Sequence, residues 1–135
     1  MENRMRELDT LKVCDILNDI IELEMAGVVR YAHSSLMITG PNRIPIVAFL
    51  QEQATESLQH ALQAGEYITG FGGHPSQQIA HIEESHNHDV NQVLTESLEH
   101  EVRAVDKYKY VTKWTPKVVF VAGTCDCKEI DQKAR

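Results

Sequence analysis

Two glutamates of this chain lie on helical faces that are otherwise apolar, and a tyrosine follows each of them seven residues later. Around Glu24, apolar or small residues recur at positions 17, 21, 28, 35 and 38, with the spacings typical of one face of a helix. Glu24 and Tyr31 fall on that face. A carboxylate on a core face costs free energy unless it is paired. The chain must therefore fold so that a buried partner reaches Glu24.

The same arrangement recurs at Glu101 and Tyr108. The face that carries this second pair is predicted from four further positions: Leu94, Leu98, Val105 and Thr112. Two buried carboxylates on two helices suggest one shared partner, and a metal ion is the leading candidate. The alternative is that each carboxylate bonds a tyrosine or a nearby arginine, Arg30 or Arg103.

The pattern predicts an all-α fold with three long helices, over about residues 9–39, 45–69 and 85–113, and a short helix over 76–83. Gly40 and Pro41 end the first helix, and the short link after them makes the second helix its antiparallel neighbour. The connection of about fifteen residues before the third helix can reach roughly 50 Å, whereas a helix of 25 residues is about 37 Å long. We therefore expect one long crossover and parallel second and third helices.

The character of the chain changes after the third helix. The run KVVFVAG at 117–123 is typical of a strand, and the residues after it are polar. We expect a helical domain over 1–113 and a divergent tail over 114–135, without a fourth amphipathic helix. Cys125 and Cys127 are too closely spaced for a zinc knuckle and are interpreted as thiols of this tail.

Composition excludes several classes of protein. The 135 residues suffice for one domain, and no apolar run approaches the length of a membrane span. The highly charged start of the chain does not resemble a secretory leader, and with three cysteines we expect a cytoplasmic location. Residues 1–102 hold five Lys and Arg against 16 Asp and Glu, a net charge of −11, which argues against tight nucleic-acid binding.

Further candidate ligands lie on the second helix. His60 follows Glu56 by one turn, so the two can share a face and bind one ion. A Glu-x-x-His motif would need glutamate at position 57, where this chain has Ser57. His86 and His88 are weaker metal candidates, and their alternative is a solvated crossover. His33 and His100 are predicted to be ordinary surface histidines.

At these residues the chain resembles the ferritin-like superfamily, in its bacterioferritin-like branch. The resemblance is carried by residues 17–41, 51–76 and 84–108, and ATESLQHALQAGEYITGFGGHP is its most distinctive segment. It implies a four-helix bundle with a di-iron carboxylate centre that oxidises Fe(II) with dioxygen or peroxide and often stores the ferric product in cages. Zinc or another divalent ion is an alternative occupant, and the residues give no basis for a haem site.

The resemblance implies a role for each matching residue. Glu24 and Glu101 match the ligands of the first and third helices, and His60 matches the imidazole of the second, with Glu56 as the nearest carboxylate. Tyr31 and Tyr108 are predicted to hydrogen-bond these carboxylates. The fourth helix, which should bring another Glu-x-x-His, has no match.

Three expectations for function follow. The first is an iron-binding protein with an incomplete di-iron site and ferroxidase chemistry only if that site is assembled. The second is a non-enzymatic helical oligomer whose metal site is vestigial. The third is a DNA-protecting mini-ferritin, which the acidic body argues against. Because three helices leave a groove that something must cover, a homo-oligomer is expected.

Overall fold

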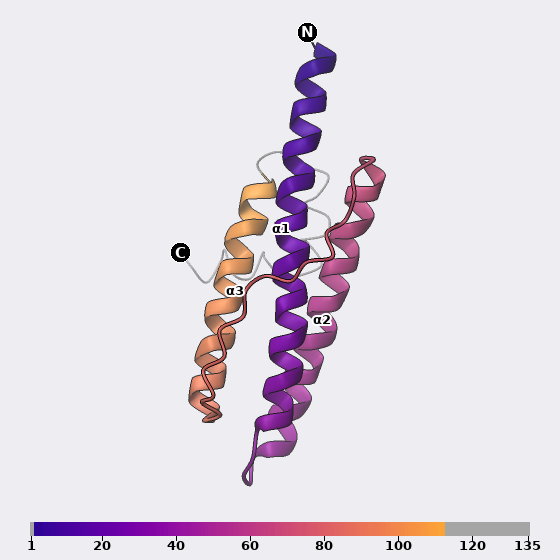
Figure 1. The fold of residues 1–135 in the computed structure, drawn as a ribbon. Helices are drawn as coiled ribbons and strands as arrows, with labels where there is room; N and C mark the ends of the chain where they lie inside the picture. Colours follow the sequence, from indigo (N-terminus) through magenta and orange to yellow (C-terminus); the bar gives the residue numbers. More distant parts are fainter. Residues whose placement is uncertain (1, 113–135) are drawn as a thin grey trace.

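The computed structural model describes the backbone of residues 2–112 and the side chains of residues 9–111. It consists of α1 (Glu2–Met37), α2 (Arg43–Gly70) and α3 (Val90–Thr112), with no strand in the described residues. Figure 1 shows that α2 runs back along α1 and that a long crossover returns the chain to the opposite end, where α3 begins. The predicted all-α bundle with one long crossover between the second and third helices is confirmed.

The starts of α1 and α3 differ from the predicted ones. α1 begins at Glu2, because the charged segment before residue 9 continues the helix. α3 begins at Val90 rather than near residue 85. The reason is Asp89, whose side-chain Oδ2 accepts hydrogen bonds from the backbone N–H groups of Asn91 and Gln92 at 3.1 and 3.4 Å. This is the capping arrangement that starts a helix.

The crossover contains no helix, so the predicted short helix over 76–83 is wrong. Its polar groups are instead satisfied by α1. The Ser76 N–H donates to Asn18 Oδ1 at 2.7 Å, and the Ser76 hydroxyl donates to Glu22 Oε1 at 2.6 Å. The Ala80 N–H donates to the Glu22 carbonyl at 2.9 Å. These partners replace the hydrogen bonds that a helix would supply, so the segment lies extended along α1.

The core consists of two apolar clusters at different levels of α1. The first cluster surrounds the N-terminal half of α1 and contains nine buried residues: Val13, Cys14, Ile16, Leu17, Ile20, Ile21, Ala64, Ile68 and Val111. The second cluster, near the α1–α2 turn, consists of Tyr31, Ile38, Leu50 and Val93. Residues 24–31 of α1 therefore connect two apolar layers, and the polar side chains of this stretch lie between them.

The face that α3 turns inward differs from the predicted one. Leu94 and Leu98 are 41% and 65% exposed, so they do not define the buried stripe. The buried residues of α3 are instead Val93, His100, Ala104 and Val111. The apolar arc of α3 is wider than one stripe, and the sequence pattern alone does not decide which flank of the arc meets α1.

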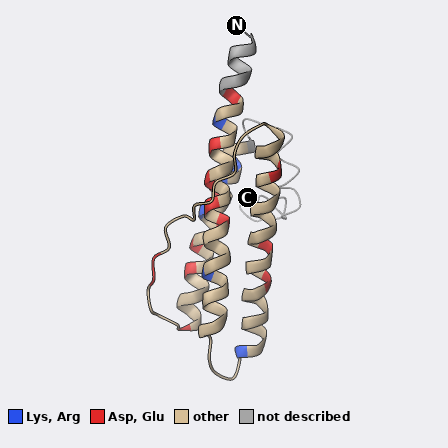
Figure 2. Cartoon of the chain, turned by 45° about the vertical axis from the view of Figure 1, so that its right-hand side comes forward, with Lys and Arg blue, Asp and Glu red and all other residues tan. Residues whose placement is uncertain are grey.

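Acidic side chains are spread over the described helices, whereas Lys and Arg are sparse (Figure 2). None of the described helices combines the length and the apolar character that crossing a membrane would need. The predictions for the tail at 114–135, for a strand at 117–123 and for Cys125 and Cys127 lie outside the described residues.

Candidate metal centre

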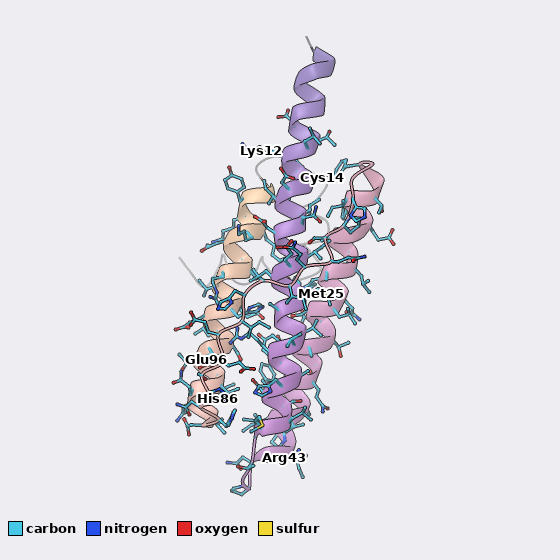
Figure 3. All side chains as sticks on the ribbon, viewed as in Figure 1. Lys12, Cys14, Met25, Arg43, His86 and Glu96 are labelled. Carbon is cyan, nitrogen blue, oxygen red and sulfur yellow. The ribbon has the colours of Figure 1, made fainter. Side chains whose placement is uncertain are left out.

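Between the two apolar clusters, α1 and α3 exchange a pair of hydrogen bonds. The Tyr108 hydroxyl of α3 donates to Glu24 Oε1 of α1 at 2.7 Å. The Tyr31 hydroxyl of α1 donates to Glu101 Oε1 of α3 at 2.5 Å. Met25, labelled in Figure 3, marks the level of this layer on α1. The predicted bonds from the two tyrosines to the facing carboxylates are present, and each glutamate has its partner on the other helix.

α2 brings an imidazole to the same layer. His60 Nδ1 lies 3.3 Å from Glu24 Oε1, and His60 Nε2 lies 3.9 Å from Glu56 Oε1. The Glu24 side chain is 5% exposed and that of Glu56 is 42% exposed, so Glu56 lies at the mouth of the layer. The ring of His60 also contacts the ring of Tyr108 edge-on, with centroids 6.3 Å apart.

Burial changes the protonation of the groups on the other side of this layer. It raises the pKa of Glu101, and the neighbouring charges of Glu24 and Glu56 act in the same direction, against the bond from Tyr31. Burial, followed by the bond to Glu101, raises the pKa of Tyr31 well above its ordinary value. Tyr31 is therefore a neutral hydrogen-bond donor to Glu101.

His100 is a buried member of this layer that the sequence interpretation placed on the surface. Only 2% of the residue is exposed, and its Nε2 is buried without a hydrogen-bond partner in the structure. Burial, and then the charge of Arg30, lowers the pKa of His100 to about 4, so the imidazole is neutral at neutral pH. Its ring meets that of Tyr31 at 88° with centroids 6.1 Å apart. The spacing of His100 from Val93 and Ala104 was the signal that could have identified it.

Two small residues make room for the His100 ring. A Cβ atom placed on Gly27 would lie 2.7 Å from His100 Nε2 and 2.9 Å from Ser57 Oγ. Gly27, Ser57 and His100 therefore meet at one point, from α1, α2 and α3 respectively. A glutamate at position 57, as in a Glu-x-x-His motif, would need space beside this imidazole.

The predicted ligands come together only in part. Glu24 and His60 are in contact, Glu56 borders them, and Glu101 is tied to Tyr31 on the other side of the layer. Among the residues that the structure describes, no three His, Cys, Asp or Glu side chains converge into a group able to hold a metal ion. In donor chemistry, Glu24, His60 and Glu101 suit one Fe(II) ion. They do not suit a two-metal centre, because Ser57 supplies no carboxylate.

The weaker candidates in the crossover, His86 and His88, contact different partners. His86 is an exposed residue whose Nε2 lies 3.9 Å from Glu84 Oε2. The ring of His88 contacts that of His33 on α1, with centroids 5.8 Å apart. The prediction that His33 lies at the surface is confirmed.

The family model described as "Ferritin-like domain" matches residues 14–117, which include α1 from residue 14 onward, α2, α3 and the polar layer. The chain belongs to the ferritin-like domain family. The predicted ferritin-like resemblance is thereby confirmed, and the layer of Glu24, His60 and Glu101 is the part of this ferritin-like chain in which a metal would be sought. No protein among the curated ones matches the chain.

A solved structure shares the fold of this ferritin-like chain. It is the crystal structure of a ferritin-like, diiron-carboxylate protein from Bacillus anthracis str. Ames, with a TM-score of 0.79. The similarity covers 94% of this chain and 98% of that one, at 20% sequence identity. At this identity the likeness establishes the helical arrangement.

Replacing Gly27 by alanine should destabilise the protein, because the added Cβ collides with His100 Nε2 and Ser57 Oγ. We expect a loss of about 1–3 kcal/mol in the free energy of unfolding, measured by urea denaturation. Gly65→Ala is the matched control, because the nearest atom to its Cβ is Ile21 Cδ1 at 3.8 Å. It should stabilise α2 by about 0.5–1 kcal/mol. Equal effects of the two substitutions would contradict this packing.

Replacing Tyr31 or Tyr108 by phenylalanine removes a hydrogen bond to a buried carboxylate. Each substitution should lower the free energy of unfolding by about 1–3 kcal/mol in the same assay. Tyr110→Phe is the control on α3, since Tyr110 is 45% exposed, and it should change stability by less than about 0.5 kcal/mol. If Tyr110→Phe costs as much as the other two, the exchange of bonds does not hold α1 to α3.

Proposed function

We propose that this protein binds one Fe(II) ion in the polar layer between α1, α2 and α3, with Glu24, His60 and Glu101 as ligands and Glu56 at the mouth. The observation that carries the proposal is the contact of a buried carboxylate, Glu24, with an imidazole from another helix, His60, at 3.3 Å. Glu101 provides a second, half-buried carboxylate from the third helix. Carboxylate oxygen and imidazole nitrogen are ligands that suit iron and other divalent first-row metals.

The tyrosine bonds are compatible with this role. Both contacts to Glu24, from Tyr108 and from His60, are made to Oε1, and Tyr31 likewise bonds Oε1 of Glu101. A carboxylate has a second oxygen through which it can bind a metal while the first accepts a hydrogen bond. Neutral donors of this kind orient metal-binding carboxylates. Binding would still require Glu101 to approach Glu24 and His60.

Iron binding is the extent of this proposal. Oxidation of Fe(II) and storage of ferric product are what the ferritin-like resemblance implies for a complete two-iron centre. The described residues offer a second ion too few ligands, because position 57 is serine and the place of a fourth-helix Glu-x-x-His falls outside residues 2–112. We therefore propose no oxidation step for the single chain.

The second candidate is a non-enzymatic helical protein whose metal site is vestigial. The observation that favours it is that both buried carboxylates already have tyrosine partners. In that case Glu24 and Glu101 have a structural role alone: they accept the hydrogen bonds that join α1 to α3. The two candidates make opposite predictions for metal binding at this layer.

An anaerobic calorimetric titration with Fe(II) distinguishes the iron-binding protein from the protein with a vestigial site. We expect one saturating equivalent of Fe(II) per chain. Glu24→Gln or His60→Ala should weaken binding at least about tenfold, since even partners outside the ligand shell cost about that much. Glu66→Gln, an exposed carboxylate on α2, is the control and should change nothing. No saturable binding, or binding insensitive to Glu24→Gln, would establish the vestigial site instead.

We also propose that two copies of the chain associate through α3. The support is a stripe of exposed apolar residues at intervals of four, Leu94, Leu98 and Val102, which are 41%, 65% and 53% exposed. A surface of this kind is typical of a face that is covered in the assembled protein. Residues 2–112 contain three helices, and a second copy is the simplest cover for the exposed face of α3.

Light scattering coupled to size-exclusion chromatography tests this association. The native chain should elute with the mass of two or more copies, and Leu98→Glu should reduce it to one, because a charge would be buried in the interface. Leu62→Glu is the control, since Leu62 is 63% exposed but lies on α2. A native chain that is monomeric at all concentrations, or that dissociates equally with Leu62→Glu, would refute the α3 interface.

A further inference from the structure

Two histidines from distant parts of the chain meet on the outer side of α1. His33 belongs to α1 and His88 to the crossover, one residue before the Asp89 cap of α3. Their ring centroids are 5.8 Å apart and their planes are inclined at 59°. The contact joins segments that are far apart in sequence, so the fold, and not a local motif, brings the two imidazoles together.

The separation of the rings suits one shared metal ion. A zinc ion lies about 2.0–2.1 Å from each ligating nitrogen, and hence roughly 3 Å from the centre of each imidazole. Two imidazoles on one ion therefore have centres about 5–6 Å apart, depending on the angle at the metal. The observed 5.8 Å falls in that interval.

The surroundings of the pair favour a cation. The histidines border a hollow of about 270 Å³ between α1, the crossover and the start of α3. Six of its lining residues carry imidazole or carboxylate groups: His33, His86, His88, Glu83, Glu84 and Glu96. Arg30 also lines it, so the carboxylates outnumber the positive charge. Figure 3 shows the labelled His86 and Glu96 near one another at the end of the bundle where α3 begins.

One of these carboxylates is oriented by a hydrogen bond within α3. Gln92 Nε2 donates to Glu96 Oε1 at 2.9 Å. Glu96 therefore has a defined position in the hollow that His33 and His88 border.

This pair is separate from the polar layer of the core. His33 follows Glu24 by nine residues, which is about 13 Å along the axis and roughly half a turn around the helix. Glu24 is buried whereas His33 is exposed. A ligand held by His33 and His88 therefore has direct access from solvent, and its binding does not depend on the function proposed for the core.

We propose that His33 and His88 form a surface binding site for zinc or a similar late first-row divalent ion. The two imidazoles are the protein ligands, and water fills the remaining coordination positions, because no third His, Cys, Asp or Glu of the described residues joins them in a metal-binding group. Because His33 lies on α1 and His88 directly before the cap of α3, an ion at this site fastens the end of the crossover to the central helix.

Calorimetric titration of the full chain with Zn(II) tests the site. We expect one equivalent of zinc to bind at this site. His33→Ala and His88→Ala should each weaken its binding affinity at least about tenfold. His81→Ala, an exposed histidine of the same crossover, should leave this equivalent unchanged. Both ligands are at or near the surface, so circular dichroism should show that the variants remain folded.

Two further measurements separate this site from the core. The equivalent should persist in Glu24→Gln, which alters only the polar layer. In a Glu24→Gln background, zinc should also raise the melting temperature, and adding His33→Ala but not His81→Ala should abolish that rise, because ions that bind only the folded state stabilise it. Retention of tight binding in both His33→Ala and His88→Ala would overturn the proposal. So would loss of the equivalent in Glu24→Gln, or an equal loss in His81→Ala.

Discussion

The exchange of tyrosine–glutamate hydrogen bonds between α1 and α3 is the constraint on which the bundle depends. α1 carries a buried carboxylate and α3 a half-buried one, and each accepts a hydrogen bond from a tyrosine of the other helix. α1 packs against α2 along much of its length, but it meets α3 over a shorter stretch (Figure 1). Hydrogen bonds to charged groups are worth about 1.5–3 kcal/mol each. Two of them, in opposite directions, therefore fix both the position and the register of α3.

The chemical nature of the partners matters as much as their position. An arginine opposite each glutamate would have neutralised the layer and removed its attraction for cations. Tyrosine donates to the carboxylate through a neutral hydroxyl and brings no positive charge to the layer. The buried imidazole of His100 is neutral as well, because its pKa is lowered to about 4. The layer thus combines acidic oxygen donors with neutral groups, a composition suited to holding a positive ion.

The sequence predicted the helices, the long crossover and the buried faces of Glu24 and Tyr31 because apolar periodicity and glycine breaks report directly on local structure. The predicted buried face of α3 was wrong, because Leu94 and Leu98 are exposed and Val93 and His100 are buried in their place. Periodicity defines an apolar arc, but the neighbouring helix decides which part of the arc is buried. The helix expected at 76–83 failed for a related reason, since the partners of Ser76 belong to α1 and are invisible to a local pattern.

The candidate site was predictable to the extent that it repeats a motif. Glu24, Glu101 and their tyrosines were found from one recurring spacing, and His60 from its position on α2. His100 and the pairing of His33 with His88 were missed, because they depend on contacts between segments that are distant in the chain. Gly27 and Ser57 gave no signal either, as their role is to leave space for the side chain of His100.

The long sequence separation of these contacts has a consequence for how the protein folds. The hairpin of α1 and α2 closes through a short turn, so it can form early, whereas the tyrosine bonds join residues 70 and 84 positions apart. Contacts that close such long loops form late, because the entropy of loop closure must be overcome first. We expect the hairpin to be a folding intermediate in which Glu24 is still hydrated. The carboxylates lose their water only when α3 docks, so the desolvated, ion-attracting layer exists only in the completed fold.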